Sequence, residues 1–145
     1  MASMAGISVL VVDDHALFAD ALQARLRRAG DLGRITVAYD ARDALQQASA
    51  TRPAVVILDI VLNDRSGLDL VEDVRRVSPE SNIVILTAVE SVEDVVTAVS
   101  RGARAWLPKT VDSDYLVRVR SWSSVSCSRG FGTTASGRRA MSTTV

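Results

Sequence analysis

The stretch VVILDIVLND, residues 55–64, decides how this chain is expected to fold. Five apolar residues, counting Ala54 in front of the stretch, lead directly into the carboxylate of Asp59. A short, β-branched run of this kind predicts a strand buried in the core. A buried strand that ends on an acid is either accidental or a way of holding a nucleophile or a metal ligand rigidly at the edge of the fold.

Similar runs alternate with helix-period segments along the rest of the chain. We expect strands over residues 7–13, 34–40, 54–59, 82–88 and 103–109, and helices over residues 16–30, 41–52, 67–77 and 91–102. This alternation predicts an α/β fold built from right-handed strand–helix–strand units. The expected sheet is doubly wound, five-stranded and parallel, in the flavodoxin-like order 2-1-3-4-5, with helices on both faces. Ligands bind such sheets outside the carboxyl ends of the strands, where Asp59 stands.

Apolar spacing also predicts which side of each helix faces the sheet. The first helix should turn inward Phe18, Leu22, Leu26 and Ala29, and the third Val71, Val74 and Val77. The helix over 91–102 opens with a capping box, Ser91 to Asp94, and its apolar stripe comprises Val92, Val95, Val96 and Val99.

Composition excludes little and favours a soluble globular domain. The formal net charge of zero gives no bulk field that would attract nucleic acid or a membrane surface. The apolar runs are far shorter than the ~20 residues that span a bilayer, and the first residues lack the basic region of a signal peptide. The single cysteine, Cys127, cannot form an internal disulfide, so a cytoplasmic location is expected.

The character of the chain changes after residue 120. Residues 121–145 contain eleven serines or threonines, three arginines and no acid. We therefore expect one domain over 1–120 with a truncated fifth helix beginning near residue 112. A tail over 121–145 follows, and it is disordered or non-native, as a cloning remnant or an out-of-frame translation would be.

Four of the expected strands end on groups that can carry chemistry. Asp13 and Asp14 follow the first strand, Asp59 the third, Thr87 ends the fourth, and Lys109, the only lysine beside sixteen arginines, ends the fifth. The first and third strands should be neighbours, which brings three carboxylates together. Two charges about 4 Å apart repel by ~4 kcal/mol at an effective dielectric near 20, so the cluster needs a counter-charge. A divalent cation that prefers oxygen ligands, Mg²⁺, is the natural one. Taken alone, Asp13 and Asp14 are also explained as a helix cap and a first-turn charge.

The motifs VLVVDDH, VVILDIVLNDRSGLDL, VILTA and GARAWLPK together resemble the receiver domain of bacterial two-component response regulators. The likeness covers roughly residues 6–120 and is greatest to the NarL/FixJ type, whose full-length members carry a C-terminal helix-turn-helix that has no counterpart here.

The resemblance implies a role for each residue of the motifs. Asp59 would accept a phosphoryl group from a histidine kinase, and Mg²⁺ would be held by Asp13, Asp14, Asp59 and the backbone carbonyl of Val61. Thr87 and Lys109 would contact the phosphoryl oxygens. Trp106 falls at the aromatic switch position, usually Tyr or Phe, although plain core packing also explains it.

Two residues depart from the family pattern, and a third, His15, directly follows the paired acids. The family usually has proline where this chain has Asn63, and Asp or Asn where it has Ser66. His15 either completes an Asp-Asp-His metal set or simply lies in the first turn after the first strand, and the second explanation is favoured.

Two other functions compete with a phosphorylation switch. A haloacid-dehalogenase-like phosphatase also uses an aspartyl nucleophile after a buried strand, but it needs a second acid two residues later, where this chain has Val61. A degenerate receiver that acts only as an interaction module is disfavoured by the complete acid, threonine and lysine set. We therefore expect a signalling protein and not an enzyme, with a sensor histidine kinase as partner, a homodimer as an option, and no binding to DNA or membranes by this chain itself.

Overall fold

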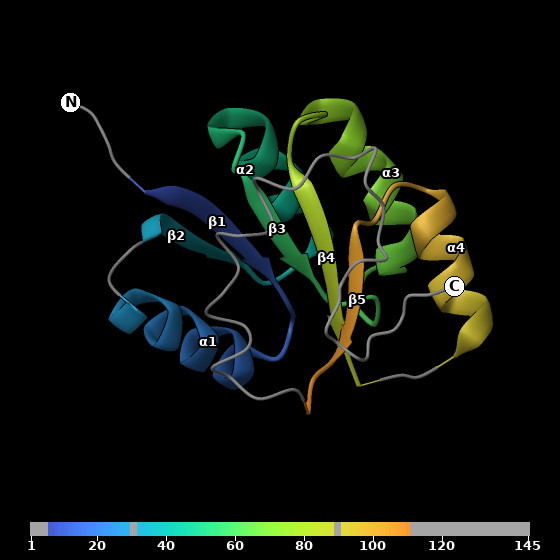
Figure 1. Cartoon of the computed structure of the whole chain (residues 1–145), viewed down its shortest axis with the longest axis horizontal. Coiled ribbons are helices and arrows are strands. Elements are labelled where there is room, and N and C mark those ends of the chain that lie inside the picture. The colour runs from blue at the N-terminus through green and yellow to red at the C-terminus, as the bar shows by residue number, and fades with distance from the viewer. Residues whose placement is uncertain (1–5, 30–31, 89–90, 111–145) are drawn as a thin grey trace.

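The computed structural model describes residues 6–29, 32–88 and 91–110 (Figure 1). Along the chain the elements are β1 (Ile7–Val12), α1 (Ala16–Ala29), β2 (Leu32–Ala38), α2 (Ala41–Thr51), β3 (Val55–Leu58), α3 (Gly67–Val77), β4 (Asn82–Thr87), α4 (Val92–Ser100) and β5 (Ala105–Pro108). The expected fifth helix and the tail over 121–145 lie outside the described residues. No helix within the described ranges is long and apolar enough to cross a membrane.

The five strands form one parallel sheet in the order β2-β1-β3-β4-β5. The predicted order is therefore confirmed, and strand order reverses between β1 and β3. Val12 lies opposite Leu58 at the carboxyl ends of these two strands. The residues that follow each of them consequently leave the sheet side by side, at the place where doubly wound folds bind ligands.

Helices cover both faces of the sheet. In Figure 1, α1 lies on one side of the strands, and α2, α3 and α4 lie on the other. Alternate residues of each strand supply the two sides of the core: Leu10 and Val12 belong to the cluster that includes α2 and α3, whereas Val9 and Val11 pack with α1. All four residues of β3 are buried, as expected for a central strand of a parallel sheet.

The predicted inward faces of two helices are confirmed. Leu22 and Leu26 of α1 are buried, and so are Val71 and Val74 of α3. Phe18 and Val77 are partly buried against the same clusters.

The predicted face of α4 is wrong. Val92, Val96 and Val99 are exposed, with 79%, 53% and 39% of their surface accessible, and Ala98 is the buried residue of the helix. The spacing of the valines identified residues that share one face of the helix. It did not establish whether that face points toward the sheet or toward solvent. The small side chain of Ala98 packs inward, Val95 is half-buried, and Val92, Val96 and Val99 lie on the outer side. The predicted cap is present, because the Ser91 hydroxyl accepts from the backbone N–H of Asp94.

The second strand also begins and ends two residues earlier than expected. It ends at Ala38 because Asp40 serves as the N-cap of α2, where its side chain accepts from the backbone N–H of Asp43. An Asp at this position satisfies a helix N–H that would otherwise lack a partner.

Candidate functional site

Three carboxylates meet at the carboxyl ends of β1 and β3. The backbone N–H of Asp59 donates to the carbonyl of Val12 over 3.0 Å, so the register of the sheet continues into the acidic residues. Asp13 and Asp59 are only 2% and 3% exposed. One ligand atom from each of Asp13, Asp14, His15 and Asp59 lies within 4.8 Å of the others. The sheet topology therefore produces the acidic cluster that the strand ends predicted.

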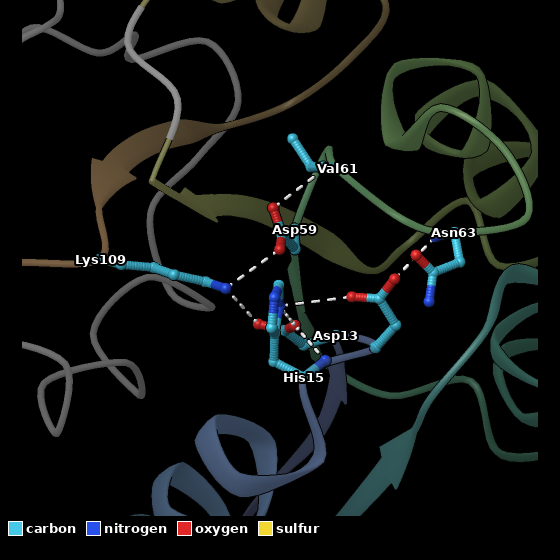
Figure 2. Close-up of polar contacts among 7 residues, drawn as sticks. Asp13, His15, Asp59, Val61, Asn63 and Lys109 are labelled. Carbon is cyan, nitrogen blue, oxygen red and sulfur yellow. Dashed lines mark hydrogen bonds and ion pairs between the residues drawn. The ribbon is translucent and has the colours of Figure 1, made fainter.

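Lys109 supplies the counter-charge in the cluster. It follows β5, and its Nζ lies 2.8 Å from Oδ2 of Asp13 and 3.0 Å from Oδ2 of Asp59 (Figure 2). The ammonium also stands 4.6 Å from the centroid of the Phe18 ring, at a distance typical of a cation–π contact. The only lysine of the chain thus bridges the two buried acids found among the described residues.

The pKa of Lys109 reflects opposing effects. Burial disfavours the charged ammonium and lowers its pKa, whereas the hydrogen bonds to Asp13 and Asp59 favour the charge and raise the pKa. The two carboxylates together outweigh burial, so the pKa of Lys109 lies above its ordinary value.

The loop after β3 fixes the orientation of the acids. The backbone N–H of Val61 donates to Oδ1 of Asp59 over 3.0 Å, and that of Asn63 donates to Oδ2 of Asp14 over 2.7 Å (Figure 2). Proline, the usual residue of the resembled family at position 63, has no N–H to donate. The departure at Asn63 therefore gives this chain an additional contact to Asp14.

Gly67 closes the same loop. Its N–H donates to the carbonyl of Ile60 over 2.8 Å, and Val61 pairs with Ser66 in an isolated bridge. A Cβ at position 67 would lie 2.4 Å from both the carbonyl oxygen of Asp59 and the Cα of Ile60. Only glycine permits this approach of α3 to the backbone of Asp59.

Thr87 and Trp106 lie next to the cluster on adjacent strands. Thr87 is fully buried at the end of β4, and its carbonyl accepts from the backbone N–H of Lys109 over 2.9 Å. Trp106 lies opposite Ile85, two residues before Thr87, and is partly buried against the core cluster on that side of the sheet. Thr87, Lys109 and Trp106 therefore lie on or directly after one strand pair, β4 and β5.

The donor chemistry of the cluster fits a divalent cation. Three carboxylates face one ammonium, so negative charge remains to be balanced. Carboxylate oxygens are the ligands that Mg²⁺ prefers, together with several waters. The predicted ligands Asp13, Asp14 and Asp59 are together, and Val61 lies beside them through its bond to Asp59.

The structure also shows features that the sequence did not reveal. The placement of Phe18 under Lys109, the amide of Asn63 on Asp14 and the close approach of Gly67 all depend on loop or side-chain geometry. His15 lies in the first turn after β1, as expected, and its Nδ1 lies 3.2 Å from Asp13 and 3.3 Å from Asp14. The sequence DDH was the one available signal for this contact.

Comparison with known proteins agrees with this geometry. Residues 9–120 match the family model of the response regulator receiver domain. Over 111 residues the chain is 35% identical to the "Probable transcriptional regulatory protein TcrX" of Mycobacterium tuberculosis, covering 77% of this chain and 47% of that protein. The chain thus spans about half the length of this relative.

Two solved structures share the fold. The receiver domain of the putative NarL response regulator of M. tuberculosis superposes with a TM-score of 0.74 at 25% identity, covering 80% of this chain and 94% of that one. A Burkholderia pseudomallei response regulator, crystallised with a phosphorylated aspartic acid, a calcium ion and citrate, gives a TM-score of 0.73 at 29% identity, covering 79% and 66%. Matched over most of its length, this chain belongs to the response regulator receiver-domain family.

Proposed function

We propose that this chain is a phosphorylation-activated signalling switch that accepts a phosphoryl group on Asp59 from a sensor histidine kinase. The observation that carries the proposal is the contact between Asp59, 3% exposed at the end of a buried strand, and the ammonium of Lys109 3.0 Å away. In a longer protein the switch would control transcription, as the name of the relative TcrX suggests. Its place of action would be the cytoplasm.

The proposed reaction is an in-line phosphoryl transfer. An oxygen of the Asp59 carboxylate attacks the phosphorus of a phosphohistidine, the new O–P bond forms, and the P–N bond breaks with its electron pair remaining on the imidazole nitrogen. The product is an acyl phosphate and a neutral histidine. Such a transfer depends on positioning and charge neutralisation more than on covalent assistance. The N–H of Val61 and the ammonium of Lys109 hold the two carboxylate oxygens for this purpose.

The same residues would bind Mg²⁺. Asp13, Asp14, Asp59 and the backbone carbonyl of Val61 would hold the ion, which when bound supplies positive charge against the phosphoryl oxygens. The amide of Asn63 keeps Asp14 turned toward the site. The phosphorylated aspartic acid and calcium ion in the Burkholderia relative support both parts of the proposal.

Thr87 and Trp106 would transmit the change. We assign to the Thr87 hydroxyl a hydrogen bond to the new phosphoryl group and to Lys109 an ion pair with it. Movement of Thr87 would alter the space available to Trp106, which packs on the same side of the sheet two positions away along the strand pair. Phosphorylation of Asp59 would thereby change how Trp106 packs.

A labelling experiment separates this proposal from its competitors. Acetyl phosphate and Mg²⁺ are added to the full chain, and intact mass and released phosphate are followed. A switch gains one phosphoryl group and releases phosphate slowly. Continuous release in many turnovers would identify a phosphatase instead, and a lack of both adduct and release would identify a degenerate receiver.

Self-association is the second part of the proposed function. The exposed valines of α4, Val92, Val96 and Val99, supply an apolar surface that a homodimer could bury. Size-exclusion chromatography with light scattering, before and after acetyl phosphate treatment, tests it. Replacement of Val96 by Asp should prevent any dimer that uses this surface.

A further inference from the structure

The loop between β3 and α3 is tied to two parts of the molecule by adjacent residues. The backbone N–H of Asn63 donates to Oδ2 of Asp14 over 2.7 Å at the acidic cluster (Figure 2). The next residue, Asp64, turns its carboxylate to the start of α2, where the backbone N–H of Ala41 lies 3.1 Å from Oδ2 and 3.4 Å from Oδ1. The loop therefore links the first turn of α2 to Asp14.

The contact at Ala41 fills a position that α2 itself leaves open. The N–H groups of a first helical turn have no partner within the helix. The N-cap residue Asp40 uses its side chain for the N–H of Asp43, 2.8 Å away. Ala41, the first residue of the helix, receives its acceptor from Asp64, 23 residues later. Because a carboxylate at a helix N-terminus is also favoured by the helix dipole, the fold has a specific reason to hold Asp64 in this place.

The peptide group that donates to Asp14 is held on both sides. Leu62, which precedes it, is buried in the core cluster that also contains Ala41. Asp64, which follows it, is exposed and is fixed by its carboxylate instead of by burial. Asn63 itself is exposed as well. The position of the Asn63 N–H consequently depends on what the side chains of its two neighbours contact.

We propose that Asp64 is a positioning residue for the acidic site: by capping α2 it keeps the Asn63 N–H on Asp14 and so fixes the direction of the Asp14 carboxylate. The inference rests on the proposed function, because Asp14 would be one of the Mg²⁺ ligands. It leaves the ligands of the ion unchanged and gives a cause for the orientation of one of them. Loss of a partner that orients a metal ligand typically changes metal affinity by about tenfold or more, and Asp64 acts one step further away.

The test compares the starting protein with three variants of the full chain. Asp64→Ala removes the acceptor for Ala41. Asp64→Asn removes the charge but keeps a side-chain oxygen that can accept from the same N–H. Asp40→Ala removes the other cap of α2, which bonds to Asp43 and not to the loop after β3. This last variant is the matched control for a general loosening of the helix.

Calorimetric titration with Mg²⁺ gives the first readout. We expect Asp64→Ala to lower the Mg²⁺ affinity by about threefold to tenfold, at or below the lower end of the effect of losing a direct partner of a metal ligand. Asp64→Asn should recover most of this loss, and Asp40→Ala should bind Mg²⁺ as the starting protein does. An unchanged affinity in Asp64→Ala would overturn the proposal. Equal losses in the two Asp64 variants, or in Asp64→Ala and Asp40→Ala, would do so too, because charge or helix stability would then explain the effect.

The amide signal of Asn63 reports the positioning without any metal. A short bond from an N–H to a carboxylate moves the amide proton to low field in a ¹H–¹⁵N NMR spectrum. We expect this low-field position in the metal-free starting protein, in Asp64→Asn and in Asp40→Ala, and a shift to higher field in Asp64→Ala. An Asn63 signal that stays in place in Asp64→Ala would contradict the role of Asp64, whatever the Mg²⁺ affinity.

Failure of this inference is distinguishable from failure of the proposed function. Neither measurement contains a phosphoryl donor, whereas the acetyl phosphate experiment on the unmodified chain reports on Asp59. A chain that is labelled at Asp59 but keeps its Asn63 signal in Asp64→Ala would be a switch in which Asp14 is oriented without Asp64. If the starting protein bound no Mg²⁺, the proposed metal site would fail, and the Asn63 signal would still decide whether Asp64 orients Asp14.

Discussion

The ammonium of Lys109 lies 2.8 Å from Asp13 and 3.0 Å from Asp59, so one side chain from the edge strand β5 holds together two acids that are almost fully buried. Removing either acid therefore changes the balance of charge in a measurable way.

Asp59→Asn should abolish labelling by acetyl phosphate and preserve the fold. Asn is nearly isosteric with Asp and cannot form the acyl phosphate, and it relieves repulsion with Asp13. We expect a thermal midpoint equal to or above that of the starting protein when metal is absent. Asp69→Asn, an exposed acid on α3 paired with Arg101, is the matched control and should still be labelled. Labelling of Asp59→Asn at another residue would reject the assignment of the acceptor.

Stability should fall at alkaline pH through Lys109. Its pKa is raised in the folded protein, so its contribution is fully present below the ordinary value near 10.5 and is lost as pH rises through the higher folded value. Because the chain has one lysine, the ¹³Cε signal of a lysine-labelled sample reports this pKa directly. In Asp59→Asn one of the two raising contacts is gone, so the transition should move to lower pH. An identical transition in both proteins would show that Asp59 does not stabilise the ammonium.

Asn63→Pro should weaken Mg²⁺ binding and lower stability by about 1 kcal/mol. The substitution removes the N–H that donates to Asp14 over 2.7 Å, and a hydrogen bond of this kind contributes roughly 1 kcal/mol. Asn63→Ala is the matched control, because alanine keeps the backbone N–H. Calorimetric titration with Mg²⁺ and urea unfolding measure the two effects. Equal behaviour of the two variants would mean that the amide does not orient Asp14.

Gly67→Ala should be strongly destabilising. Its Cβ would meet backbone atoms of Asp59 and Ile60 at 2.4 Å, and overpacking of this kind costs typically 1–3 kcal/mol or more. Ser66→Ala, which removes only the N-cap bond to Leu68, should cost about 1 kcal/mol. The unfolding free energies of the two variants are compared by urea denaturation. A smaller loss in Gly67→Ala than in Ser66→Ala would mean that the loop yields without cost.

Autodephosphorylation should be slow and should be accelerated by Val61→Asn with Val89→Glu. Val61 is 48% exposed beside Asp59 and cannot orient a water, whereas a polar side chain there can position the attacking nucleophile. Val89 lies outside the described residues. It is chosen because it follows Thr87 by two residues in the sequence. The assay is decay of the phosphorylated protein after donor removal, with Mg²⁺ present, and the double variant should decay faster than either single one. If the double variant decays at the original rate, water access does not limit the lifetime.

Much of this architecture was predictable because it depends on short-range patterns. The run from Ala54 to Leu58 identified a central strand, and parallel neighbours then required Asp13 and Asp59 to meet. The direction of the α4 valines was not predictable, since periodicity carries no information about which side of a helix meets the sheet. The contact of Asn63 with Asp14 was hidden, because it depends on how the loops after β1 and β3 approach one another across 48 intervening residues.

The solitary lysine also has a practical consequence. For amine-directed reagents, such as the activated esters used to attach dyes or to couple proteins to sensor chips, Lys109 is the only lysine side chain in this sequence. Lys109 is 15% exposed and engaged by two acids, so it should react slowly, and each molecule that does react loses the counter-charge of its cluster. Attachment through thiol chemistry at Cys127, the only cysteine, does not consume the Lys109 ammonium. The rate of amine modification would report how often the Lys109 ammonium leaves Asp13 and Asp59.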